Sequence, residues 1–402
     1  MARSLASASG HALEQASIAQ ADHGPTLARV EIFSDPAAAD GVWSALEALA
    51  PASAYQTRAW LTPWYDTIAR GQGMRPLISI AYDAAGEACG LLPLCIMNRG
   101  PLRLAEFAGG KDANYSFGLF RPGLAWRARD LRRWFTLTAR QAGERIDLFA
   151  LVNQPESWCG AANPLRALGG QTSPSQGYCT TLTQDADAFV TSRTSADARK
   201  KLRSKQRRLA SLGKISFFTA TDASAANAVL AAIAAQKAQR MKDMGVKNSF
   251  ADPQAEAFLR LAALNFPARG TGGLELHAMS LNDKVIATFG GAAHQGRFSG
   301  MFNSIELDPA IARNSPGEHL LQWLIQAKCR EGLTGFDLGA GAARYKDTWC
   351  ETPERLFDLY VPVTAAGWAL YAVKAGKRRL KRAIKESAVV WALAQRLRKA
   401  RA

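Results

Sequence analysis

The apolar positions of the chain predict two similar series of strands and helices, one in each half. In the first half, two apolar runs separated by the turn Asp83–Gly86 predict a hairpin over 76–97. A strand over 102–107, a basic helix over 126–142 and a strand over 145–149 follow the hairpin. A hairpin that leads through a helix into another strand is typical of a sheet covered by helices.

The second half repeats this order of elements. Apolar runs at 274–281 and 285–293 predict another hairpin, and a third strand is predicted over 298–305. A helix over 316–331 carries leucine and isoleucine at helical spacing, and the short apolar run at 336–338 predicts the next strand. The repetition indicates an internal duplication, with a period too long for a solenoid.

The two series predict an α/β (α+β) protein with two tandem units, each a mixed central sheet flanked by helices. Ile146–Leu148 and Phe336–Leu338 hold corresponding places, and a strand over 356–363 is expected to complete the second unit. The predicted segments are a disordered leader at 1–25, a first unit at 26–182, a basic connecting helix at 183–214, a second unit at 215–364 and a basic amphipathic helix at 365–402.

The formal net charge of +16 is concentrated in two of these segments. Residues 193–214 hold nine Lys/Arg against one acid, and residues 367–402 hold eleven against one, so the rest of the chain is nearly neutral. Such clusters attract anionic surfaces such as nucleic acid or phospholipid. In 367–402 the basic residues share a predicted helix with Val373 and Leu380, which is typical of a membrane-surface helix or a docking helix.

The remaining composition predicts a cytoplasmic protein that contacts membranes peripherally, if at all. No apolar run approaches ~18 residues, so no membrane-spanning helix is predicted, and residues 1–25 lack the pattern of a secretory signal. The cysteines form no Cys-x-x-Cys pair and have no histidine at metal-ligand spacing. Free buried thiols and no metal are therefore expected for the cysteines at 89, 95, 159, 179, 329 and 350.

The start of the helix over 316–331 follows the rules for a capped N-terminus. Ser315 is placed to cap, Pro316 occupies the first helical position, and Glu318 lies three residues after the cap, which predicts a capping box. The first backbone N–H groups of a helix are unpaired, so the same start can bind an anion. A plain helix cap and a phosphate site both remain open at this point.

Several motifs, in their order and spacing, resemble those of known transferases. The chain resembles the CelD-like acetyltransferases linked to cellulose and exopolysaccharide synthesis, a branch of the GNAT superfamily. It is similar, more distantly, to FemAB-type aminoacyl transferases, which carry two GNAT units in tandem. The resemblance covers roughly 54–363 and rests on Tyr55–Trp60, Gly90–Leu94, Asn114–Tyr115, Arg199–Arg208 with Gly213, Ser315–Gly317, Phe336–Gly339 and Tyr345–Lys346.

The resemblance implies two GNAT-like units and acyl transfer from a thioester, usually acyl-CoA, to an amine or hydroxyl. In GNAT proteins a Gln/Arg-x-x-Gly-x-Gly/Ala loop receives the pyrophosphate of the donor, and the matching residues here are Arg313, Asn314, Ser315 and Gly317. Pro316 stands where the first glycine is expected and removes one N–H donor. Glu318 adds a negative charge within the first turn. These departures leave room for a donor other than CoA.

Four residues of the second half are candidates for catalysis. Asp337, in an apolar strand, is either a general base or a structural acid paired with Arg344 or Lys346. Tyr345 is a candidate acid for the leaving thiolate, and Lys346 a candidate ligand for a phosphate or carboxylate; ordinary packing is the alternative for both. His294, at the end of a strand, is either a general base or a turn histidine in water.

In the first half, the polar loop after Gly109–Gly110 is the candidate acceptor site. It holds Asp112, Asn114 and Tyr115, and binding residues favour loops carried by a rigid scaffold. A simple surface loop is the alternative.

The leading hypothesis is a cytoplasmic tandem-GNAT acyltransferase without a metal. It would move an acyl group, acetyl first, from acyl-CoA to a small-molecule or saccharide acceptor such as a cell-envelope or exopolysaccharide precursor. One alternative is a FemAB-like transferase that uses aminoacyl-tRNA. The basic connecting helix and the imperfect donor loop support this alternative. Another is a non-catalytic GNAT scaffold of a polysaccharide-synthesis assembly, held at an anionic membrane by residues 367–402.

Overall fold

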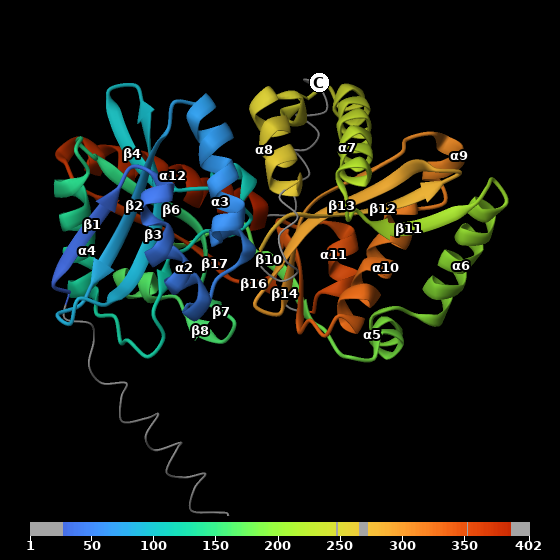
Figure 1. Cartoon of the computed structure of the whole chain (residues 1–402), viewed down its shortest axis with the longest axis horizontal. Coiled ribbons are helices and arrows are strands. Elements are labelled where there is room, and N and C mark those ends of the chain that lie inside the picture. Colours follow the sequence, from blue (N-terminus) through green and yellow to red (C-terminus); the bar gives the residue numbers. More distant parts are fainter. Residues whose placement is uncertain (1–26, 247, 265–271, 352, 387–402) are drawn as a thin grey trace, which may run out of the picture.

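The computed structural model describes residues 27–246, 248–264, 272–351 and 353–386. These residues form two mixed sheets that lie side by side, each flanked by helices (Figure 1). The predicted fold class is confirmed. The predicted leader at 1–25 and the end of the predicted C-terminal helix, at 387–402, lie outside the described residues.

The first sheet has the strand order β1-β2-β3-β4-β6-β17-β9, with the short β5 (Leu119–Phe120) beside β3. Residues of β2 alternate between two helical layers. Ile78 and Ile80 pack with α2 and α3, whereas Leu77 and Ala81 pack with α4. The elements are β1 (Arg29–Phe33), α2 (Asp40–Leu49), α3 (Arg58–Trp64), β2 (Arg75–Tyr82), β3 (Ala88–Arg99), β4 (Leu102–Phe107), α4 (Ala128–Gln141), β6 (Leu148–Pro155), β9 (Gln171–Thr172) and β17 (Leu356–Pro362).

The second sheet has the strand order β11-β12-β13-β14-β15-β10-β16. The core on one face includes residues of α10 and α5, and α7 and α8 pack in the core on the other face. The elements are β10 (Gly177–Thr181), α5 (Ala186–Arg193), α6 (Ala196–Ala210), β11 (Ile215–Thr219), α7 (Ala223–Asp243), α8 (Pro253–Leu264), β12 (Glu275–Leu281), β13 (Lys284–His294), β14 (Arg297–Ile305), α9 (Pro309–Ala312), α10 (Pro316–Arg330), β15 (Gly335–Ala340), α11 (Arg344–Trp349) and β16 (Pro353–Glu354).

The two sheets exchange strands, which corrects one prediction. The strand predicted over 356–363 was assigned to the second unit, but β17 pairs with β6 and β9 of the first sheet. In return β10, which precedes the basic helix in sequence, pairs with β15 and β16 of the second sheet. An apolar run of this length specifies a buried strand but not its partner, because both sheets offer an edge of similar character. The other predicted segment boundaries stay predictions.

The exchange accompanies a core that is continuous between the units. Trp60 of α3 packs edge to face against Phe258 of α8, with ring centroids 4.7 Å apart. Tyr55, which precedes α3, packs against both Trp60 and Tyr115. Aromatic rings bury large areas, so this seam holds the two units in one arrangement.

Two further expectations concern membranes and thiols. No helix in the described ranges is long and apolar enough to cross a membrane. The six cysteines are free, and four of them are buried as predicted, but Cys159 is exposed and Cys179 is only partly covered.

Candidate functional site

The parallel neighbours β14 and β15 stay paired over only three residues. Their ladder joins Arg297–Ser299 to Gly335–Asp337. Beyond it β14 continues along β13, while β15 continues along β10. The two strands therefore separate, and main-chain groups that face the gap need other partners.

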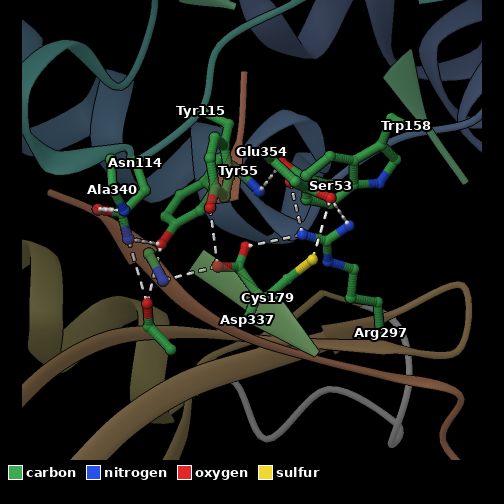
Figure 2. A network of polar contacts seen from close by, with 12 residues as sticks. Ser53, Tyr55, Asn114, Tyr115, Trp158, Cys179, Arg297, Asp337, Ala340 and Glu354 are labelled. Carbon is green, nitrogen blue, oxygen red and sulfur yellow. Dashed lines mark hydrogen bonds and ion pairs between the residues drawn. The ribbon is translucent and has the colours of Figure 1, made fainter. Parts of the chain in front are cut away.

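Asn114 of the first unit supplies some of those partners (Figure 2). Its Nδ2 donates to the carbonyl of Gly300 on β14 at 3.1 Å, and its Oδ1 accepts from the N–H of Ala340 on β15 at 3.2 Å. Tyr55 donates its hydroxyl to the same Gly300 carbonyl at 3.3 Å and accepts from Asn114 at 2.6 Å. Gly339 is required here, because a Cβ on it would lie 2.4 Å from the Asn114 amide.

A bulge in β14 lies at the same point. Gly300 pairs with Gly291 and Phe302 with Gly290, which leaves Met301 as the extra residue. The glycines permit this, since a Cβ on Gly290 would lie 2.2 Å from the Phe302 ring. A bulge re-aims the local backbone, so the gap is bordered by main chain that departs from the regular ladder.

Asp337 lies behind Asn114, at the centre of a buried polar network (Figure 2). Its Oδ1 accepts from the Tyr115 hydroxyl at 2.8 Å and from the Gly339 N–H at 2.6 Å. Its Oδ2 lies 3.6 Å from a nitrogen of Arg297. The Arg297 guanidinium also makes two 3.0 Å hydrogen bonds to Glu354 and stacks 3.8 Å from the Trp158 ring centroid. Residues of both units thus meet at one carboxylate.

Burial decides the charge state of this carboxylate. Desolvation raises the pKa of Asp337 to about 6, against the opposing effects of Arg297 and the Gly339 N–H. Burial also raises the pKa of Tyr115 well above its ordinary value, and the neighbouring Asp337 adds to the rise. The predicted structural partners of Asp337 were Arg344 or Lys346, and this is wrong for the ion pair, which Arg297 makes.

A pocket of about 250 Å³ opens between the units next to Asn114. Lys111, Asp112 and Asn114 give it a polar side, and Met301 of the bulge lies on its wall. The rest of the lining is apolar: Trp60, Ile68, Phe250, Ala255, Phe258, Leu259 and Phe302. Two of the three predicted acceptor residues, Asp112 and Asn114, therefore line a real pocket beside the gap.

Within this pocket Asp112 is the carboxylate best placed to act on a ligand. It accepts a hydrogen bond from Trp64 Nε1 at 3.1 Å, and burial raises its pKa. Lys111 and Asp112 also line a second pocket of about 340 Å³, which reaches Glu106 and Asn153 of the first sheet. The third predicted acceptor residue, Tyr115, is fully buried beneath the loop.

The loop before α10 differs from the predicted capping box. Ser315 adopts a left-handed conformation, φ 55° and ψ 53°, and its side chain makes no capping hydrogen bond. A side-chain cap needs an extended backbone at this position, so the prediction is wrong. The N–H of Ser315 bonds to Ala312 and that of Glu318 to Ser315, and Pro316 has none. Few N–H groups remain to cradle a phosphate.

Cations of α6 lie over this loop instead. Lys205 Nζ donates to Ser315 Oγ at 2.8 Å, and Arg208 Nε donates to Asn314 Oδ1 at 3.1 Å. Arg313 is exposed, and Gly317 packs close to Ile305 at the end of β14. The predicted donor residues 313, 314, 315 and 317 thus lie together at the mouth of the gap, with the basic helix against them.

The seam between α6 and α10 continues into a pocket of about 220 Å³ lined by Arg199, Arg203, His319 and Trp323, among others. His319 is buried, and its Nε2 has no hydrogen-bond partner among the described residues. Burial lowers the pKa of His319 to about 4, so the ring is neutral at pH 7. The positive charge of this pocket therefore comes from Arg199 and Arg203 and not from His319.

The other predicted catalytic residues lie in different places. Tyr345 is partly exposed and interacts with the Asn303 side chain of β14, and burial raises its pKa. Lys346 is buried and donates to the carbonyls of Gly339 and Ala340, at 3.1 and 3.2 Å. His294 is buried at the end of β13, where it pairs with Arg297 at the start of β14, away from the gap. It is not a turn histidine exposed to water.

Residues 196–347 match the family described as acetyltransferase (GNAT) domain. The crystal structure of FemX is similar at a TM-score of 0.56 and 11% identity, over 86% of this chain and 99% of that one. A conserved protein of unknown function from Bacteroides thetaiotaomicron is similar at a TM-score of 0.51 and 10% identity, over 82% and 99%. No curated protein matches.

These comparisons confirm the coarser part of the predicted resemblance. Residues 196–347 match a GNAT acetyltransferase domain, and the fold is similar to that of FemX over 86% of the chain. The CelD-like exopolysaccharide type stays a prediction. Sequence reasoning missed Arg297, Glu354 and Lys205 as parts of the site. Arg297 and Glu354 are 57 residues apart and meet only because β10 enters the second sheet.

Proposed function

We propose that this chain is an acyltransferase that takes the acyl group of an acyl-CoA, acetyl-CoA first, and transfers it to an amine or hydroxyl. The observation that carries the proposal is the gap between β14 and β15. It opens beside the start of α10 and onto the pocket between the units. The polar and apolar lining of that pocket favours a small-molecule or saccharide acceptor, such as a cell-envelope or exopolysaccharide precursor.

The donor's anionic end is assigned to the start of α10. The loop offers few N–H groups, so Lys205 and Arg208 of α6 supply the positive charge that phosphates need. The acyl end is assigned to the gap, where the main chain of the Met301 bulge can donate to the thioester carbonyl.

The reaction is direct attack on the thioester. The acceptor nitrogen or oxygen forms a bond to the carbonyl carbon, and backbone N–H groups at the bulge stabilise the negative oxygen. The carbon–sulfur bond then breaks, and the thiolate takes the proton of the Tyr345 hydroxyl. Asp112 takes the proton that the acceptor loses, and water returns a proton from Asp112 to Tyr345. The products are the acylated acceptor and free CoA thiol.

Asp337 has a positioning role in this proposal. Its carboxylate has no exposed surface and bonds to Tyr115 and Gly339, so it holds the walls of the gap. The earlier interpretation of Asp337 as the base that meets the acceptor stays a prediction, and Asp112 is the better placed carboxylate.

The test is release of free thiol by the purified chain from acetyl-CoA and longer acyl-CoA, across a panel of amines, amino sugars and glycans. The proposal expects acceptor-dependent release that Asp112→Asn reduces strongly. Asp66→Asn is the matched control, because Asp66 is an exposed acid on the neighbouring helical turn. No release with any acceptor would contradict the proposal.

One observation favours a second candidate, transfer from an aminoacyl-tRNA. Apart from the contacts with the α10 loop, α6 exposes a basic surface that includes Lys200, Lys201 and Arg207. This candidate expects salt-sensitive retention of tRNA that weakens when Arg207 and Arg208 are changed to Gln. Absence of tRNA binding at low salt would exclude it.

A further inference from the structure

The C-terminal helix α12 (Ala365–Glu386) is fixed to the first sheet by one face. Gly367 lies so close to β6 that a Cβ on it would be 1.8 Å from the Asp147 carbonyl oxygen. Arg378 donates to Asp358 at 2.7 Å and to Asn153 at 3.0 Å. Lys374 lies 3.4 Å from Glu106. These contacts set which face of α12 points away from the protein.

The outward face is apolar. Trp368, Val373 and Leu380 are 60%, 52% and 63% exposed. Small residues at helical spacing connect them into one stripe of exposed positions, namely Ala369, Ala372, Gly376 and Ala383. Among the described residues, three of the ten exposed large hydrophobic side chains lie on α12. Single exposed apolar residues are ordinary, whereas a cluster on one fixed helix marks a contact surface.

Basic side chains border this stripe. Lys377 and Lys381 lie along one edge and Arg379 along the other, and all three are exposed. The only acid of α12 is Glu386, at its end. An apolar stripe between rows of Lys and Arg is the pattern of a helix that lies in the interface of an anionic bilayer. A second copy of the same face would bring like charges together, which charge complementarity disfavours.

We propose that α12 docks the protein on an anionic lipid surface. Trp368, Val373 and Leu380 enter the boundary between headgroups and acyl chains, and Lys377 and Lys381 contact lipid phosphates. This assignment is independent of the proposed acyl transfer. The sequence predicted membrane contact by residues 367–402 as a whole. The structure restricts this contact to one face of α12, because the other face packs against the first sheet.

The experiment is co-sedimentation of the full chain with vesicles of phosphatidylcholine alone, and with vesicles holding about 30% phosphatidylglycerol. The wild-type chain is expected to bind the anionic vesicles, and to bind them less as salt rises. Val373→Glu with Leu380→Glu, and separately Lys377→Glu with Lys381→Glu, should each weaken binding more than tenfold. All four positions are exposed, so the fold should be retained.

The matched controls are Leu49→Glu, an equally exposed leucine on α2 at 60%, and Lys200→Glu with Lys201→Glu on the other basic helix. These should leave vesicle binding within about twofold, as expected for substitutions at distant sites. Equal losses in the controls, equal binding to both vesicle types, or no binding to either would overturn the proposal. Self-association of the wild type that Leu380→Glu abolishes, without vesicle binding, would assign the face to a second copy instead.

Discussion

The strand pairs β4–β6 and β14–β15 hold corresponding places in the two sheets, but their surroundings differ. Each pair is parallel and stays bonded over a few residues, Leu104–Ala105 with Leu148–Phe149 in the first sheet and three residues in the second. A pocket lies beside each gap, of about 340 and 250 Å³. The duplicated architecture therefore offers two clefts of one kind.

The main helix between the two strands of each pair distinguishes the two clefts. The loop before α4 lines a pocket of about 180 Å³ with Trp126 and Trp158, and the one cation of this lining, Arg121, is paired with Asp83. The loop before α10 contacts Lys205 and Arg208. A phosphorylated donor needs positive charge at this point, so only the second cleft suits it. In our proposal, the basic helix α6 gives the second cleft a place for the anionic end of the donor.

The corresponding acids Asp147 and Asp337 show the same divergence. Both are fully buried. Asp147 accepts from the Arg103 N–H at 2.9 Å and from the Thr364 hydroxyl at 2.7 Å, and these bonds overcome its burial and lower its pKa. At Asp337 the effect of burial exceeds that of its cation and hydrogen bonds, and it raises the pKa to about 6. One acid anchors the segment before α12, and the other holds the seam between the units.

The largest expected effect is a difference in the free energy of unfolding between the networks around Asp337 and Asp147. Arg297→Ala leaves Asp337 and Glu354 without their buried cation, and this should lower the free energy of unfolding by about 3–5 kcal/mol. Arg145→Ala, at the half-exposed partner of Asp147, should cost less than about 1 kcal/mol. Urea unfolding measures the free energy of unfolding of both variants. Equal losses would show that the Arg297 network stabilises the protein no more than the Arg145–Asp147 ion pair does.

The next effect concerns chemistry in the second cleft. Tyr345→Phe should lower kcat roughly 100-fold, because it removes the acid for the leaving thiolate, while Tm stays near the wild-type value. Tyr360→Phe, in β17 of the first sheet, is the control and should leave kcat unchanged. An unaltered kcat for Tyr345→Phe would remove this residue from the mechanism.

A smaller effect is expected at the donor loop. Lys205→Gln should weaken acetyl-CoA binding about tenfold, which corresponds to ~1.4 kcal/mol, because a charged contact to phosphate is lost. Lys201→Gln, on the exposed side of α6, should change the Kd little. Titration calorimetry measures both constants, and equal losses would indicate a diffuse field rather than a specific contact.

The last effect is a difference in the sign of the pH dependence that the two acids give to stability. The folded chain keeps the Asp337 proton up to about pH 6, whereas the ordinary pKa is 3.8, so this group makes the protein less stable as pH rises between these values. The pKa of Asp147 is lowered, so its stabilisation is present above pH 3.8 and is lost at lower pH.

The measurement for this prediction is Tm across pH for the wild type, Asp337→Asn and Asp147→Asn. The stability of the wild type relative to Asp337→Asn should fall as pH rises from about 4 to 6. Relative to Asp147→Asn it should fall as the solution becomes more acidic than about pH 4. The same sign for both acids would refute the contrast drawn here.

Local pattern was sufficient to predict most elements and part of the site. The hairpins, α10 and the polar loop at Asp112 and Asn114 follow from periodicity and turn residues, which act within a few positions. The sheet that β17 joins cannot be predicted in this way, because an apolar run is equally suited to either sheet. Nor can the Arg297–Glu354 pair be predicted from local pattern, since its geometry depends on how the two sheets exchange strands. The left-handed backbone of Ser315 could not be predicted either, because the sequence around it satisfies the rules for a capping box.

The central claim is that the donor occupies the β14–β15 cleft and not its counterpart. Asn303→Trp places a large ring beside Tyr345, the proposed acid for the leaving thiolate, and Val152→Trp fills the pocket beside the first gap. Titration calorimetry of acetyl-CoA into each folded variant tests the claim directly. The account predicts one site per chain in the wild type, retained in Val152→Trp and lost in Asn303→Trp. Loss in Val152→Trp with retention in Asn303→Trp would contradict it.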